Sequence, residues 1–232
     1  MLQEGFVKNL ANYDHSSIIL FTLFLGGMVG IIYKNGGMEG LVSFLKRYVK
    51  SKKSAQVTGW IMGILIFFDD YANTLLVGNT LRPLTDTYKI SREKLSYIVD
   101  STAAPVTSIA LISTWIGYEI SLISESFSNL GISENPYLFF IRTIPYRFYP
   151  IFALFFGFLI AYSLRDFGPM FKAEKRAFEE GKVVRDGSNP LGFQREEKVL
   201  PSSPFLAIIP IIFVFFGCFL MLYVTGIQNL GY

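Results

Sequence analysis

The sequence predicts an all-α polytopic membrane protein, with about four to five transmembrane helices in a single membrane domain over residues 1–232. Of the 232 residues, 51% are hydrophobic and only 17% are charged, whereas soluble domains carry about 25% charged residues. The charged residues gather in a few segments that separate long apolar runs. This arrangement is typical of a helical protein that crosses the bilayer several times.

Five apolar segments have the length that a bilayer-spanning helix needs, which is about 20 residues. They lie at about 17–33, 57–81, 95–123, 144–164 and 204–226. The connections between them predict the orientation, because Lys and Arg accumulate on the cytoplasmic side. This rule assigns 34–56, 82–94 and 165–203 to the cytoplasm and 125–143 to the outside.

The assignment conflicts with a single crossing by 57–81, since the segments before and after it are both expected in the cytoplasm. One solution is a re-entrant hairpin that enters the membrane and returns, and the other is that 82–94 violates the charge rule. Irregular backbone is tolerated at membrane depth where it is buried in protein. We favour the hairpin, with its turn near Asp69 and Asp70.

Three aspartates in the apolar segments are the strongest functional signal: Asp69, Asp70 and Asp100. An ionisable group costs about 2.5–3.5 kcal/mol at the centre of a membrane helix. A structural role, such as pairing with a Lys or bridging two helices, is the alternative, but the runs around these aspartates contain no Lys or Arg. We therefore expect them to bind a proton or a cation.

The neighbours of the aspartates supply further oxygen atoms. Asp70, Asn73 and Thr74 are spaced i, i+3, i+4 and share one face of a helix. Carboxylate, amide and hydroxyl oxygens suit a hard cation. If the chain turns at the aspartate pair, Asp69 and Asp70 can both face one cavity.

A second polar group, Asp100, Ser101 and Thr102, is followed by Pro105 inside the third apolar segment. Proline has no N–H and clashes with the carbonyl four residues earlier, so we expect a broken or kinked helix at Pro105 that frees the Ser101 carbonyl. Secondary transporters hold coupling ions at such breaks. The candidate Na⁺ ligands are Asp70, Asn73, Asp100 and Ser101.

The run FFDDYANTLLVGNTLRPLTDTYKISREKLSYIVDSTAAPVTSIALISTWIGYE, from Phe67 to Glu119, resembles the NhaC-type Na⁺/H⁺ antiporter family. The segments LGGMVGIIYKNGG and KAEKRAFEEGKVVRDG are similar to the same family. The resemblance implies a multi-pass antiporter of the inner or plasma membrane that exchanges cytoplasmic Na⁺ for external H⁺. Some relatives exchange malate or lactate instead. The matching positions imply that Asp69, Asp70, Asn73, Asp100, Ser101 and Thr102 form the ion and proton site.

The chain departs from this family in length, because family members are longer and have repeated halves. The alternative function is therefore a fragment or subunit that needs the missing half or a second copy. The expected partners are the lipid bilayer, Na⁺ and H⁺, with no cofactor and no nucleic acid, since the net charge is only +3.

An enzyme is the remote alternative. Asp69-Asp70-x-x-Asn73 resembles the Mg²⁺-diphosphate motif of prenyltransferases, but a second Asp-rich motif is missing. An intramembrane aspartyl protease is also disfavoured, because the Gly-rich context of a second Asp is missing. Two acidic residues outside these motifs leave alternatives open. Asp86 is expected to cap the following helix or to belong to a gate, and Glu119 to be interfacial or part of the ion pathway.

Overall fold

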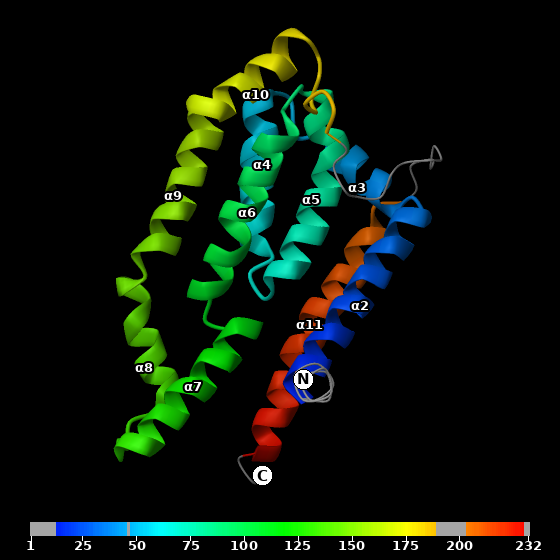
Figure 1. Ribbon diagram of the computed structural model, residues 1–232. Helices are drawn as coiled ribbons and strands as arrows, with labels where there is room; N and C mark the ends of the chain where they lie inside the picture. The colour runs from blue at the N-terminus through cyan, green and yellow to red at the C-terminus, as the bar shows by residue number, and fades with distance from the viewer. Residues whose placement is uncertain (1–12, 46, 189–202, 230–232) are drawn as a thin grey trace, which may run out of the picture. The chain divides into compact units, whose positions relative to one another are not determined.

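The computed structural model describes residues 13–45, 47–188 and 203–229, which form helices and contain no strand (Figure 1). The predicted all-α class is confirmed for this part of the chain. Residues 189–202 of the predicted cytoplasmic loop 165–203 lie outside the described residues. The chain divides into two compact units, residues 1–43 with 197–232 and residues 44–196.

The first unit contains α2 (Tyr13–Lys34), most of α3 (Gly37–Leu45) and α11 (Phe205–Asn229), and α2 contacts α11. Gly36 has a φ of 76° in the turn between α2 and α3, a conformation that glycine adopts without strain. Gly37 lies so close to α11 that an added Cβ would be 3.0 Å from the Ala207 nitrogen. The turn at Gly36 and the close approach of Gly37 to Ala207 together set the position at which α3 begins after α2.

The described residues of the second unit form eight helical segments, with α6 at their centre. Their bounds are α4 (Lys52–Leu65), α5 (Asp70–Thr87), α6 (Arg92–Ile109), α7 (Thr114–Leu130), α8 (Pro136–Thr143), the 3-10 turn Ile144–Tyr146, α9 (Phe148–Ser163) and α10 (Gly168–Glu179). Helix α6 packs against α4, α5, α7, α9 and α10. Five of these helices, α4 to α8, begin after a residue whose side-chain oxygen accepts a backbone N–H of the first turn: Ser51, Asp69, Ser91, Ser113 and Asn135. Such caps satisfy N–H groups that the helix leaves unpaired.

Helices α4 and α5 form an antiparallel hairpin. At its open end the Tyr88 hydroxyl donates a hydrogen bond to the Val49 carbonyl oxygen at 2.5 Å. In its middle, a Cβ on Gly59 would lie 2.9 Å from a methyl carbon of Leu81. The segment expected at 57–81 therefore forms two antiparallel helices that turn near the aspartate pair, with ends at the two helix bounds given above. This is the hairpin arrangement that the charge pattern favours. That this hairpin re-enters the membrane stays a prediction.

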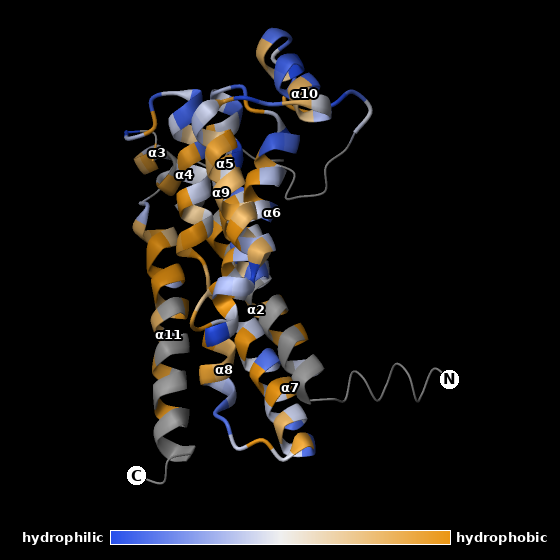
Figure 2. Cartoon of the chain, turned by 90° about the vertical axis from the view of Figure 1, so that its left-hand side faces the viewer, coloured by the Kyte–Doolittle hydropathy of each residue, from blue (hydrophilic) through white to orange (hydrophobic). Residues whose placement is uncertain are grey.

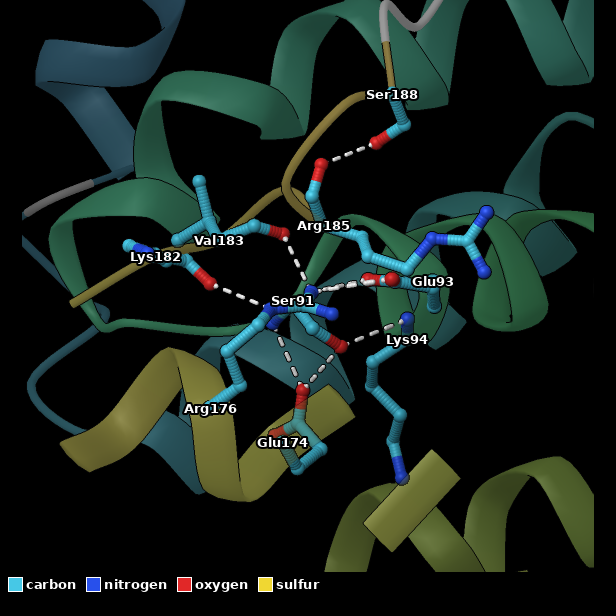
Figure 3. Close-up of polar contacts among 9 residues, drawn as sticks. All are labelled: Ser91, Glu93, Lys94, Glu174, Arg176, Lys182, Val183, Arg185 and Ser188. Carbon is cyan, nitrogen blue, oxygen red and sulfur yellow. Dashed lines mark hydrogen bonds and ion pairs between the residues drawn. The ribbon is translucent and has the colours of Figure 1, made fainter. Parts of the chain in front are cut away.

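Three segments with the same predicted side of the membrane meet at the open end of this hairpin. Figure 3 shows residues of two of them, 82–94 and 165–203. Buried Glu174 of α10 accepts hydrogen bonds from the Ser91 backbone N–H at 2.8 Å and from the Ser91 hydroxyl at 2.7 Å. Its other oxygen lies 2.7 Å from the Lys52 ammonium. One carboxylate thus joins parts of 34–56, 82–94 and 165–203.

Further contacts hold the start of α6 to the segment after α9. Fully buried Lys94 pairs with Asp166, and Arg176 pairs with Glu93 at 2.9 Å. The Arg92 backbone N–H donates to the Val183 carbonyl oxygen at 2.9 Å. Because burying an unpaired charge is costly, the pairing of Lys94 indicates that this end is built as one polar cluster.

The polar cluster and the neighbouring helix α9 differ in hydropathy. Figure 2 shows hydrophilic residues along α10, whereas α9 is largely hydrophobic. Large apolar side chains are exposed on α9, among them Phe152, Phe155 and Leu159. An apolar surface of this kind is suited to lipid or to another helix.

One described helical stretch, Phe148–Glu179, is long and apolar enough to cross a membrane. Helices α6 and α7, bent by 43° at their break, form a second if they act as one span. These lengths are consistent with a polytopic protein, and the number of crossings stays a prediction.

Candidate functional site

The hairpin turn between α4 and α5 is closed by Asn73, whose side chain is fully buried. Its amide nitrogen donates to the carbonyl oxygens of Gly63 at 2.6 Å and Ile66 at 3.0 Å. The last carbonyls of a helix have no partner within that helix. Asn73 therefore completes the end of α4 from the first turns of α5.

Asp69 stands at the turn as the N-cap of α5. It is only 3% exposed. Its Oδ1 accepts the Ala72 backbone N–H at 2.8 Å, and its Oδ2 accepts the Thr114 hydroxyl at 3.0 Å. The carboxylate thus bridges the hairpin turn and the start of α7.

Asp70, the first residue of α5, is half-buried and has a different partner. Its Oδ1 accepts the indole N–H of Trp115 at 3.1 Å. The Thr114 backbone N–H donates to the Phe68 carbonyl oxygen at 3.0 Å. The two aspartates are adjacent in sequence, and both face the first residues of α7.

The break in the third apolar segment lies at residues 110–113, between α6 and α7. The break expected at Pro105 is wrong in position, because Pro105 lies inside α6, which continues to Ile109. A proline removes one helical hydrogen bond. The packing of α6 against α4, α5 and α9 offsets this loss and keeps the helix continuous.

Carbonyl groups at the true break have partners from distant parts of the sequence. The Arg147 guanidinium donates to the Ser108 carbonyl oxygen at 3.0 Å, and the Tyr137 hydroxyl donates to that of Leu111 at 3.0 Å. The Ser113 hydroxyl donates to the Thr107 carbonyl oxygen at 2.8 Å. Irregular backbone at membrane depth requires such internal partners.

The predicted face of Asp70, Asn73 and Thr74 is divided by the structure. Asn73 points into the hairpin, whereas Thr74 is exposed. Among the described residues, the Asn73 side-chain oxygen has no hydrogen-bond partner. Asn73 thus leaves one oxygen atom available, and Thr74 is not grouped with it.

The second predicted group, Asp100, Ser101 and Thr102, is also divided. Thr102 is buried against Gly63, and its hydroxyl donates to the Ile98 carbonyl oxygen at 2.9 Å. Ser101 lies beside Gly157 of α9. Asp100 is exposed and lies nine residues, or about 14 Å of helix, before the end of α6. No contact in the described part of the chain joins it to the aspartate pair.

The ion pair between Glu119 and Arg147 lies outside the predicted site and was not predicted from the sequence. Glu119 of α7 pairs with Arg147, which also lies over the Phe140 ring at 4.6 Å. The signal was Arg147 itself, a cation near the start of the apolar segment 144–164. Glu119 is therefore paired with Arg147, and its interfacial or pathway role stays a prediction.

Asp86 does not cap the next helix, because Ser91 is the N-cap of α6. Asp86 pairs instead with Arg92 at 2.8 Å. Burial raises the pKa of Asp86, and this effect exceeds the opposing attraction of Arg92 and Arg82.

The donor set at the turn consists of two carboxylates and one amide oxygen. Among the described residues, no three His, Cys, Asp or Glu side chains gather as a site for a metal ion. Carboxylate and amide oxygens bind hard cations, and carboxylates also bind protons. The donors at the turn are therefore of the chemical types that bind either a cation or a proton.

Comparisons with known proteins give the family. The sequence model of the Na⁺/H⁺ antiporter family matches residues 106–231, which contain the break, Thr114, Trp115 and Arg147 and begin after the aspartate pair. An uncharacterized protein of Haemophilus influenzae is 33% identical over 167 residues, which are 72% of this chain and 32% of that protein. The chain thus spans about a third of the length of this relative.

No solved structure matches the chain. The family match covers more than half of the 232 residues. The matching family is a family of membrane transporters. The chain belongs to the Na⁺/H⁺ antiporter family.

Proposed function

We propose that the chain forms part of an NhaC-type Na⁺/H⁺ antiporter of the inner or plasma membrane, crossing it several times. In this proposal Asp69 and Asp70 bind Na⁺ and H⁺ in turn. The observation that carries it is the meeting of two breaks, at which both carboxylates receive hydrogen bonds from the first residues of α7.

The chemistry of such a site supports exchange. Charged groups are expensive inside a membrane and mark ion pathways there. Transporters hold coupling ions between broken helices near the midplane. A carboxylate that releases its proton gains affinity for Na⁺, and Na⁺ at the site favours loss of the proton. This competition couples the two ions without a cofactor.

Of the predicted group Asp100, Ser101 and Thr102, exposed Asp100 enters the proposal at a second place on α6. On α6, exposed Asp100 shares a face with exposed Ser96 and half-buried Ala104. A carboxylate on such a face is unsuited to lipid. We therefore assign the covering partner to a further transporter segment, supplied by a longer chain or by a second copy. The length of the Haemophilus influenzae relative favours the longer chain.

A disulfide test distinguishes these partners. Ser96→Cys, combined with Cys218→Ala, is oxidised in membranes. Dimers of the chain alone would identify a second copy as the partner. Cross-links that form only when the rest of a longer relative is co-expressed would identify the missing half, and the absence of both would remove this surface from the proposal.

Exchange of malate or lactate, as in some NhaC relatives, is the second candidate function. It differs from Na⁺/H⁺ exchange in that an organic acid is transported. Everted vesicles containing the chain are challenged with Na⁺ or with each acid, and proton flux is followed by a pH-sensitive dye. Na⁺ alone is expected to drive the flux.

Asp70→Asn is the decisive variant, and exposed Asp186→Asn in the loop after α10 is its control. We expect Asp70→Asn to abolish Na⁺-driven flux and Asp186→Asn to retain it. Na⁺-driven proton flux that remains in Asp70→Asn would contradict the assignment of Asp70 to the ion site. If a properly inserted parent moves nothing, the same assay is run with the missing half supplied, which tests the subunit alternative.

A further inference from the structure

A cavity of about 730 Å³ lies at the charged end of the second unit. It is lined by the first residue of α4, by the segment between α9 and α10 and by one face of α10. Phe171 and Phe178 of α10 form its aromatic wall, and both side chains are exposed. None of the candidate ion-site residues lines it. Six charged residues also line the cavity: Lys52, Arg165, Asp166, Glu174, Lys175 and Glu179.

Two of the three acidic groups in this lining are already neutralised. Asp166 pairs with fully buried Lys94. Glu174 lies 2.7 Å from the Lys52 ammonium and also accepts hydrogen bonds from Ser91. These carboxylates belong to the polar cluster that holds α10 to α4 and α6, so they do not repel an anion as unpaired charges would.

The cationic groups of the lining are less fully paired. The Lys175 ammonium and the Glu179 carboxylate are exposed and lie 3.9 Å apart, too far for a hydrogen bond, and such a pair contributes little. In the part of the chain that the structure describes, no acidic side chain pairs with exposed Arg165. The cavity therefore presents two exposed cations, Arg165 and Lys175, to an anionic ligand.

The aromatic wall of the cavity continues the apolar surface of α9. The ring of exposed Phe167, in the segment before α10, lies 6.1 Å from the ring of exposed Phe156 of α9. Phe171, Lys175 and Phe178 are spaced i, i+4, i+7 and share one face of α10. Because α9 belongs to the stretch that is apolar and long enough to cross a membrane, this face of α10 begins where a lipid-facing surface ends.

The two kinds of lining select a class of ligand. Arg forms paired hydrogen bonds to phosphate, and a Lys ammonium adds a point charge. Exposed Phe rings beside basic residues on one helix face are typical of helices that lie at the lipid headgroups. A soluble phosphate would leave the Phe171 and Phe178 rings in water. An anionic phospholipid satisfies both the cations and the rings.

We propose that this cavity binds one anionic phospholipid. Its phosphate contacts Arg165 and Lys175, and its acyl chains lie along Phe171 and Phe178 toward the exposed apolar surface of α9. The bound lipid also stabilises α10, which carries Glu174 of the polar cluster. This site does not depend on ion exchange at the aspartate pair, because it requires only that the chain lies in a membrane.

Native mass spectrometry of the purified full chain tests the site, since it counts bound lipids as detergent micelles are titrated with dioleoylphosphatidylglycerol or dioleoylphosphatidylcholine. We expect one phosphatidylglycerol to bind at lower concentration than phosphatidylcholine. Arg165→Gln and Lys175→Gln are each expected to weaken this binding about fivefold, since one basic residue at an anionic lipid surface contributes about 1 kcal/mol. Equal binding of the two lipids by the parent would overturn the proposal.

Lys172→Gln is the matched control. Lys172 is an exposed residue of the same helix that does not line the cavity, so its loss is expected to leave phosphatidylglycerol binding unchanged. A loss as large as in Lys175→Gln would mean that the lipid responds to the total charge of α10 and not to a site. Arg165→Lys retains the cation and is expected to keep the preference for phosphatidylglycerol.

Two further measurements separate a lipid site from its alternatives. Soluble glycerol 3-phosphate carries the same phosphate without acyl chains, and we expect it not to displace phosphatidylglycerol. Displacement would assign the cavity to a soluble anion and overturn the lipid. Because Arg165 and Lys175 are exposed, their Gln variants are expected to unfold at the parent's temperature without lipid and to lose the added stability that phosphatidylglycerol gives the parent. Full stabilisation of both variants by this lipid would refute the site.

Discussion

Asn73 donates a hydrogen bond to the Gly63 carbonyl oxygen at 2.6 Å, across the α4–α5 hairpin. Gly63 is required there for a second reason. An added Cβ would lie 2.6 Å from the Thr102 Cβ, closer than side chains pack. The α4–α5 hairpin, the Asn73 side chain and α6 therefore all come together at Gly63, which has no side chain.

Gly63→Ala is expected to destabilise the protein, because overpacking a filled core costs about 1–3 kcal/mol. Gly78→Ala is its matched control, since Gly78 is also within a helix and an added Cβ would meet nothing within 4 Å. There, alanine is expected to stabilise by about 0.5–1 kcal/mol. Thermal unfolding in detergent measures both, and equal midpoints would contradict the close approach.

Asn73→Asp tests the cap itself. The substitution replaces the donating amide by a carboxyl group that faces two carbonyl oxygens, so the ionised form makes neither hydrogen bond and the protonated form makes at most one. We expect a loss of about 2–4 kcal/mol, since each unpaired buried acceptor costs about 1–3 kcal/mol. Asn79→Asp removes a single bond, to the Leu75 carbonyl oxygen at 2.8 Å, from a half-buried position. If Asn79→Asp lowers the unfolding midpoint as much as Asn73→Asp, the Asn73 cap stabilises the protein no more than the single hydrogen bond of Asn79.

The hairpin follows from physics that the sequence carries locally. Basic residues on both sides of 57–81 favour placing its two ends on one side of the membrane, and two aspartates in an apolar run favour a turn. Ser51, Asp69 and Ser91 precede their helices and cap them, as such residues do in general. These features depend on residues within a few positions of each other.

The second break does not follow from local sequence. Proline at 105 is the strongest local signal for a break, but α6 continues past it because three helices pack around it. The chain breaks where Arg147 and Tyr137 supply donors to its carbonyls, and these lie 26 to 39 residues away. Thr114 and Trp115 likewise meet the aspartates from 45 residues away. A single amino-acid sequence contains no local signal for such long-range partners.

Glu174→Gln tests the polar cluster at the open end of the hairpin. Glu174 joins Ser91 and Lys52, and hydrogen bonds to charged groups contribute about 1.5–3 kcal/mol. We expect faster hydrogen exchange at the start of α6 and faster proteolysis near 165–188. Glu179→Gln is the control, because Glu179 is exposed and its pair with Lys175 spans 3.9 Å, a contribution of about 0–1 kcal/mol. Unchanged protection in Glu174→Gln would remove the cluster as a stabilising element.

Labelling at positions 50 and 89 tests whether segment 57–81 returns to the side of the membrane from which it enters. Both are exposed and flank the hairpin, and the contact between Val49 and Tyr88 holds the two segments together. In a Cys218→Ala background, Lys50→Cys and Lys89→Cys are labelled with an impermeant thiol reagent in right-side-out and everted vesicles. We expect both to react in everted vesicles only, together with Lys182→Cys, whereas Ser133→Cys in the predicted outer segment reacts in right-side-out vesicles. Opposite sidedness of positions 50 and 89 would mean that the segment crosses the membrane once, and the aspartate pair would then lie on a spanning helix, not at a re-entrant turn.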